Sequence, residues 1–177
     1  MRHSYLALVA AALLGVGLLS CSYARPGSIS ACKNPEFGKA EEGFANCKPQ
    51  DAFARLQELA KHDDPKALFM LGRVYNLGGN DFGLPNIKQD YDLAMKYFVR
   101  SAKLGYAESQ DTIARYYGKF YHGKRDKESA YWACRAAVQN YPAAVAGMEL
   151  QIKVANLKQT VSQFCTPILK SPPKQKD

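Results

Sequence analysis

The stretch from 64 to 75 reads DPKALFMLGRVY, and the stretch from 106 to 117 reads YAESQDTIARYY. In the first stretch, Asp64 suits a helix N-cap and Pro65 suits the first helical position. Residues at helical spacing then form an apolar or small face: Ala67, Met70, Leu71, Val74 and Tyr75 in the first stretch, and Ala107, Ser109, Ile113, Ala114 and Tyr117 in the second. The two stretches therefore predict two copies of one amphipathic helix.

Each copy continues with a second amphipathic helix. In the first copy its face consists of Leu93, Ala94, Tyr97, Phe98, Ser101 and Ala102, with a stop at Gly105; in the second copy it consists of Ala130, Ala133, Ala137 and Val138, with Tyr141 where Gly105 sits. Pro142, Ala144 and Met148 begin a third, weaker copy, in which Glu149 holds the position of Gly72 and Ala114. One more second helix, with Ala52, Leu56, Leu59 and Ala60, precedes the first copy. Because so short a helix pair cannot bury its apolar stripe alone, we expect the copies to stack, with small residues such as Ala94 and Ala130 allowing close approach.

These residues resemble a known repeat. Ala67, Leu71, Gly72 and Tyr75, followed by Asp90, Ala94, Tyr97, Ser101, Ala102, Gly105, Ala107 and Gln110, are similar to the SEL-one-like repeat, a relative of the tetratricopeptide repeat. The resemblance covers about residues 51 to 150, although the second copy lacks the family's aromatic residue at Ala133. It implies an all-α fold, a short right-handed solenoid of antiparallel helix pairs. It also implies a binding scaffold, common in bacterial envelope proteins, without catalytic residues.

The first twenty residues have the pattern of a secretory signal segment. Arg2 gives a positive start, an apolar run extends from Leu6 to Leu19, and no acidic residue occurs before Glu36. The run is shorter than the roughly 20 residues that a membrane-spanning helix needs, and no later run approaches that length. The sequence therefore predicts export and argues against a polytopic membrane protein.

Two cleavage sites are compatible with this segment. Leu18-Leu19-Ser20-Cys21 resembles a bacterial lipobox, in which the cysteine is lipidated and becomes the new N-terminus. Ser22-Tyr23-Ala24 is an ordinary small-x-small site, with cleavage after Ala24. We favour the lipobox because Cys21 directly follows the apolar run. The expected location is the periplasm, with lipidated Cys21 as the anchor to the outer membrane.

Either cleavage leaves four cysteines, Cys32, Cys47, Cys134 and Cys165. In an oxidising compartment such separated cysteines favour disulfides over a metal site, and no Cys-x-x-Cys motif occurs. Three pairings are possible. We prefer the local one, Cys32 with Cys47 and Cys134 with Cys165, because each pair brackets one end of the ordered part. The alternative is four buried, reduced cysteines.

Length and composition fit one compact domain. The chain has 177 residues, of which 47% are hydrophobic, and a formal net charge of +8. So hydrophobic a chain is not disordered as a whole. We expect a signal segment at 1–20, a tether at 21–34, the helical repeat domain at 35–168 and a flexible basic tail at 169–177.

Motifs for catalysis, nucleotides and metals are weak. The run from Gly118 to Lys124 has P-loop spacing, but Arg125 stands where Ser or Thr would hold magnesium. His62 and His122 are remote from the cysteines and from each other, and no Gly-x-Ser-x-Gly elbow occurs. We therefore expect no catalytic residue, no metal and no cofactor, and a protein that is not an enzyme.

One stretch is both basic and aromatic. Between 115 and 127, five basic residues interleave with aromatic ones, and the predicted helices place most of the stretch in a turn. Aromatic and arginine side chains are enriched at binding hot spots. We expect a partner-binding site at Lys119, Phe120, Tyr121, His122, Lys124 and Arg125. The alternative is a solvated basic turn whose aromatic rings only cover the next helix.

Three functions fit these features. The first is a non-enzymatic periplasmic scaffold that binds a protein with an acidic surface, and small exported proteins of the repeat family include immunity proteins against antibacterial phospholipase effectors. The second is a general assembly or signalling scaffold at the outer membrane. The third, an enzyme acting on the cell wall or on antibiotics, lacks any constellation of catalytic residues. We favour the first, with membrane attachment through the lipid anchor and no nucleic-acid partner.

Overall fold

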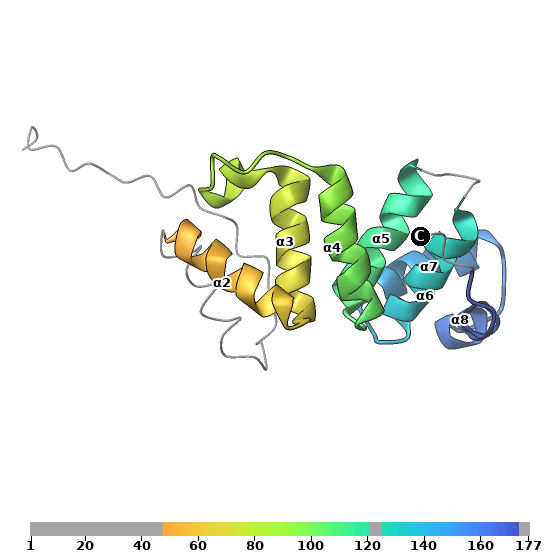
Figure 1. Ribbon diagram of the computed structural model, residues 1–177. Coiled ribbons are helices and arrows are strands. Elements are labelled where there is room, and N and C mark those ends of the chain that lie inside the picture. The colour runs from red at the N-terminus through yellow and green to blue at the C-terminus, as the bar shows by residue number, and fades with distance from the viewer. Residues whose placement is uncertain (1–47, 121–124, 174–177) are drawn as a thin grey trace, which may run out of the picture.

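The computed structural model describes residues 48–120 and 125–173, and this part of the chain is all-α. Figure 1 shows helices α2 to α6 following one another along the molecule, with α8 at the far end. The elements in order are α2 (Pro49–Lys61), α3 (Pro65–Leu77), the short 3₁₀ helix η1 (Gly79–Phe82), α4 (Tyr91–Lys103), α5 (Ala107–Phe120), α6 (Asp126–Ala137), α7 (Pro142–Val154) and α8 (Val161–Lys170). Neighbouring helices pack in succession, so the predicted all-α helical repeat fold is confirmed.

Local sequence explains where the helices begin. The side chain of Asp64 accepts hydrogen bonds from the backbone N–H groups of Lys66 and Ala67, and Pro65 is the first residue of α3. Asp90 caps α4 in the same way through the N–H of Leu93. α3 and α4 form the first helix pair and α5 and α6 form the second, so we call α3 and α5 first helices and α4 and α6 second helices.

Three junctions between a second helix and the next first helix share one backbone turn. Asp63, Gly105 and Asn140 adopt positive φ values of 58°, 95° and 60°. In each case the following N–H donates to a carbonyl five residues earlier: Asp64 to Leu59, Tyr106 to Ser101 and Tyr141 to Ala136. This is the Schellman end of a helix, for which residues that tolerate the left-handed region are needed. The repeat is therefore a property of the backbone as well as of the side chains.

The shared turn corrects the predicted register of the second copy. Asn140, and not Tyr141, holds the position of Gly105, so the earlier match of α6 to α4 is wrong by one residue. In the corrected register Ser129 replaces Ala94, and Trp132, which is 3% exposed, replaces Tyr97. The second copy therefore also has an aromatic residue, Trp132, at the position that Tyr97 holds in the first copy. Ala130 is only partly buried, whereas Ala94 is 1% exposed.

In each pair, a small residue of the first helix lies directly against the second helix. A Cβ atom at Gly72 would lie 2.6 Å from Cδ1 and Cε1 of Phe98 in α4. In the second pair, the hydroxyl of Ser129 donates to the carbonyl oxygen of Ala114 at 2.8 Å. The larger hydrophobic core extends from Leu56 to Trp132 through these contacts.

Buried polar groups at the junction between the pairs are hydrogen-bonded. The hydroxyl of Ser109 donates to that of Ser101 at 2.6 Å, and Ser101 donates to the carbonyl oxygen of Pro65. The side-chain amide of Gln110 donates to the carbonyl of Ala102 and accepts from the amide of Gln139 at 2.7 Å. Such satisfied groups favour one alignment of α5 against α4, because a shift would leave them unpaired in the core.

A disulfide organises the C-terminal end. Cys134 in α6 and Cys165 in α8 are both fully buried and are bonded to each other, as the local pairing predicts. They lie in a second hydrophobic core with Ala144 and Met148 of α7. The other predicted pair, Cys32 with Cys47, and the predicted lipid attachment at Cys21 lie outside the described residues.

Helix α8 has no counterpart in the helix predictions. It begins with a capping box, in which Thr160 accepts from the N–H of Gln163 and the side chain of Gln163 accepts from the N–H of Thr160. It contains Pro167 and ends at Lys170, two residues past the expected domain boundary at 168. It packs more extensively on α6 than on α7. Within the described ranges, no helix combines the length and apolar character needed to cross a membrane.

Candidate functional site

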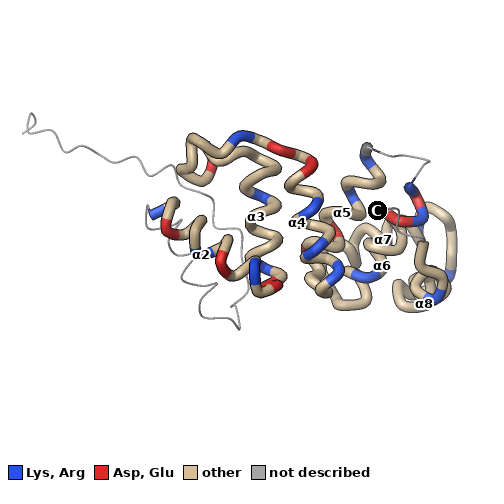
Figure 2. Tube along the Cα trace, viewed as in Figure 1, with Lys and Arg blue, Asp and Glu red and all other residues tan. Residues whose placement is uncertain are grey.

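The basic and aromatic residues lie where α5 ends and α6 begins. The prediction that most of this stretch forms a turn is wrong, because residues 115–120 belong to α5 and residues 126–127 to α6. The described members of this surface are Arg115, Tyr116, Tyr117, Lys119, Arg125 and Lys127, and we call them the α5–α6 turn surface. Figure 2 shows Lys and Arg segments on both sides of the grey gap between the two helices. Arg115, Lys119 and Lys127 are exposed. Of the predicted residues, Phe120 is the last of α5, and Tyr121, His122 and Lys124 lie outside the described residues.

Arg125 is held against an aromatic ring. Its guanidinium carbon lies 5.0 Å from the ring centroid of Tyr117, within the range of a cation–π contact. Tyr117 also meets Tyr116 edge to face, with centroids 6.4 Å apart. Of the predicted residues, Arg125 lies against a tyrosine ring, and Lys119 is exposed in the last turn of α5.

Arg115 is oriented by a buried acid that the sequence analysis did not single out. Asp111 is 4% exposed, and Nη2 of Arg115 lies 2.8 Å from its Oδ2. The contact is an ion pair without the alignment of a hydrogen bond, and within the described part of the chain this oxygen has no hydrogen-bond partner. Burial raises the pKa of the Asp111 carboxyl, and the Arg115 charge acts in the opposite direction.

The same acid faces the start of α7. Burial raises the pKa of the Tyr141 hydroxyl, and the carboxylates of Glu108 and Asp111 raise it further, whereas Arg115 lowers it. Glu108 accepts a hydrogen bond of 3.1 Å from the hydroxyl of Tyr106. This cluster combines two acids, one cation and two phenols at the junction of α5 and α7. Its sequence signal was the pair Asp111 and Arg115, four residues apart on one helix.

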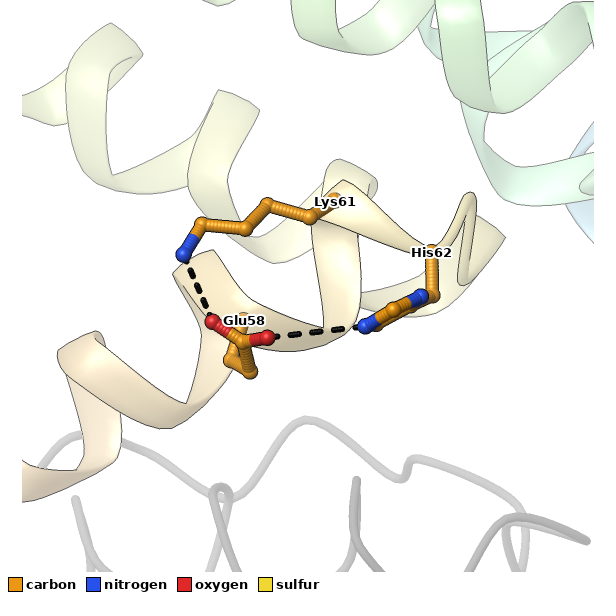
Figure 3. Close-up of polar contacts among 3 residues, drawn as sticks. All are labelled: Glu58, Lys61 and His62. Atoms are coloured by element: carbon orange, nitrogen blue, oxygen red, sulfur yellow. Dashed lines mark hydrogen bonds and ion pairs between the residues drawn. The ribbon is translucent and has the colours of Figure 1, made fainter.

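A separate charged group lies at the end of α2, and Figure 3 shows its three members. Glu58 accepts from Nζ of Lys61 at 2.6 Å, and its other oxygen lies 3.5 Å from Nε2 of His62. The Lys61 ammonium is the main cause of the lowered pKa of Glu58, and His62 contributes less. All three side chains are more than half exposed, so solvent screens these ion pairs. His62 is thus a partner of Glu58 in an exposed network.

Metal ligands and known relatives add nothing to this picture. Within residues 48–120 and 125–173, no three His, Cys, Asp or Glu side chains gather so as to hold a metal ion. Comparison of the chain with protein-family models, with curated proteins and with solved structures finds no match.

Proposed function

We propose that this chain is a non-enzymatic scaffold that binds another protein through the α5–α6 turn surface. The observation that carries the proposal is the stacking of Arg125 on Tyr117, with Lys119 exposed in the last turn of α5. Cations placed next to aromatic rings form the kind of surface at which a few residues supply most of the binding energy. The stacked helix pairs give that surface a rigid support.

The charge of this surface favours an acidic partner. Its cations are Arg115, Lys119, Arg125 and Lys127, and the whole chain has a net charge of +8. A positive surface accelerates the encounter with an acidic protein and disfavours a basic one. The ion pair of Arg115 with Asp111 fixes the direction of one of these charges before binding, which reduces the entropy cost of association.

The proposed setting is the periplasm. The signal pattern, Cys21 at the end of the apolar run and the cysteine content support an exported lipoprotein held at the outer membrane. The disulfide between Cys134 and Cys165 is in keeping with an oxidising compartment. The helical repeat fold is in keeping with the resemblance to SEL-one-like repeats.

In its sharper form, the proposal is that the chain is an immunity protein. Small exported proteins of the repeat family that it resembles include inhibitors of antibacterial phospholipase effectors, and the size and signal pattern of this chain are similar. Deleting the gene should then make cells sensitive to sibling cells that deliver a neighbouring effector. Undiminished resistance of the deletion strain would reject the immunity role and would leave the scaffold role standing.

The scaffold role is tested by affinity capture from periplasmic extract, with quantitative mass spectrometry of the bound proteins. The variant Lys119→Glu with Lys127→Glu reverses two exposed charges of the surface, and Lys88→Glu with Lys96→Glu makes the same change on the loop before α4 and on α4 itself. We expect a partner that the wild type and the control retain and that the first variant loses. Equal recovery with all three proteins would exclude the α5–α6 turn surface as the binding site.

A further inference from the structure

Helix α7 has apolar side chains on two opposite faces, of which the described chain covers one. The covered face consists of Ala144, Met148 and Ile152, which are buried. The opposite face, which we call the outer face of α7, consists of Ala143, Ala146, Leu150 and Val154, which are all exposed. Leu150 is 61% and Val154 is 79% exposed, and a Cβ atom at Gly147 beside them would meet nothing within 4 Å. Because a helix that is apolar on all sides is normally buried on all sides, we expect something to cover the outer face.

The equivalent face of the other two first helices is charged. Each first helix begins two residues after the residue with positive φ in the preceding turn, and this distance aligns α3, α5 and α7. The positions of Ala143, Leu150 and Val154 are those of Lys66, Arg73 and Leu77 in α3 and of Glu108, Arg115 and Lys119 in α5. The apolar character is therefore particular to α7 and is not a property of the repeat.

The outer face lies where a further first helix would stand. In α3, the ring of Phe69 contacts Tyr106, just before α5, with centroids 5.3 Å apart. In α5, Asp111 holds the same position and faces Tyr141, just before α7. Ala146 is the equivalent residue of α7 and is exposed. Helix α8 does not stand against it, because α8 packs mainly on α6, to which the disulfide ties it.

We propose that α7 of a second copy of this chain covers the outer face, in an antiparallel contact around a two-fold axis at Leu150. The shape of the face favours this occupant, because its small residues lie in the first half of the helix and its large residues in the second half. An antiparallel copy packs Leu150 on Leu150 and Val154 of each copy on Ala146 of the other. Such self-complementarity is what a two-fold contact between identical surfaces requires.

The charges beside the outer face are also self-complementary. Glu149 and Lys153 lie one turn apart along one edge of the face, and both are exposed. Neither has an ion pair within the described residues. In an antiparallel two-fold contact the same edges of the two helices meet, which brings Glu149 of each copy opposite Lys153 of the other. A parallel contact would instead place like charges opposite each other.

Sedimentation of the purified protein over a concentration series tests the proposal. We expect the average mass to rise to that of a dimer and no further, because a two-fold contact is closed. A single helix face is a small interface, so the dissociation constant should be micromolar. A protein that stays monomeric up to about 300 µM would overturn the proposal and leave the outer face to a different protein or to a lipid surface.

A substitution at the axis has a matched control. Leu150→Arg places two like charges opposite each other and should weaken the dimer more than tenfold. The fold should tolerate it, since Arg73 and Arg115 hold the same position in α3 and α5. Leu77→Arg makes the same change at an exposed leucine of α3 and should leave the dimer unchanged. Circular dichroism verifies that both variants fold, and a dimer insensitive to Leu150→Arg would contradict the contact.

Mixing two variants tests the antiparallel orientation. Glu149→Lys alone and Lys153→Glu alone should each weaken the dimer, because like charges then meet across the axis. An equimolar mixture of the two variants should associate more tightly than either variant does by itself, since every contact between 149 and 153 then joins opposite charges. No gain on mixing would overturn the proposal. None of the substituted residues belongs to the α5–α6 turn surface, so the outcome is independent of the partner-binding test.

Discussion

The contact between Gly72 and Phe98 gives the sharpest test of the helix-pair packing. In the substitution Gly72→Ala, the new methyl group would lie 2.6 Å from two ring carbons of Phe98 and 3.1 Å from a third. Carbon atoms normally stay about 3.5 Å apart or more, so one partner must move by about 1 Å. Phe98 has little room to move, because it is 3% exposed and its ring centroid lies 5.6 Å from that of Phe69.

Two opposing effects set the size of the change. Overpacking a well-filled core costs about 1 to 3 kcal/mol, and replacing glycine by alanine inside a helix gains about 1 kcal/mol. The contact is among the more severe ones, so we expect Gly72→Ala to lower the free energy of unfolding by about 1 to 2 kcal/mol. Gly147→Ala is the matched control, because a Cβ there meets nothing within 4 Å in the middle of α7. It should gain about 1 kcal/mol from helix propensity alone.

Urea unfolding followed by circular dichroism measures both changes, and the midpoint should fall for Gly72→Ala and rise for Gly147→Ala. The slope of the transition should stay the same in both variants, because each adds one methyl group without changing the extent of unfolding. If Gly72→Ala were stabilised as much as Gly147→Ala, α4 would not lie against Gly72, and the packing described for the helix pairs would be wrong.

Three further predictions concern other parts of the core. Ala94→Leu should lower the melting temperature by more than Ala130→Leu, because Ala94 is 1% exposed and Ala130 is only partly buried, and thermal unfolding of both variants checks this order. Cys165→Ser should lower the free energy of unfolding by about 3 to 4 kcal/mol, since it opens the cross-link to Cys134, 31 residues away; equal stability of the wild type with and without reductant would contradict it. Asp111→Asn should raise the melting temperature at pH 7. Burial raises the folded-state pKa of Asp111, so ionisation of this carboxyl lowers the stability of the wild type as the pH rises from the unfolded-state pKa through the folded-state pKa. The stability gained by Asp111→Asn should therefore shrink toward pH 4. A gain that stays constant between pH 4 and pH 7 would refute the raised pKa of Asp111.

The sequence predicted the elements whose ends carry strong local signals. Asp64 with Pro65 marks the start of α3, and Asp90 marks the start of α4, and both carboxylates cap as expected. These signals are local because a cap satisfies backbone groups of its own first turn. Gly105 likewise ends its repeat in the left-handed region.

The one-residue error in α6 has a physical origin. Alanines at 130, 133, 136 and 137 offer nearly the same small-residue face in two adjacent registers, so the apolar pattern alone does not choose between them. The backbone chooses, because Asn140 enters the left-handed region more readily than Tyr141 does. If the two copies are aligned first on the turn residues Gly105 and Asn140, the register is correct, and Trp132 is the aromatic residue that matches Tyr97.

Two features needed the tertiary structure. α8 begins with a recognisable capping box at Thr160, but Pro167 breaks the helical pattern, and the helix depends on the disulfide and on α6 for its place. The burial of Asp111 was hidden because an acid four residues before an arginine is typical of an exposed helix face. For the proposed binding surface, the sequence supplied the residue types, and the structure adds the stacking of Arg125 on Tyr117.

The central claim is that a stacked helical array presents a basic, aromatic turn to a protein partner. Hydrogen–deuterium exchange of the captured complex, compared with the isolated protein, tests this claim most directly. The account predicts that amides between 115 and 127 gain the largest protection on binding. Protection confined to α2 and α3, with exchange between 115 and 127 unchanged, would contradict it.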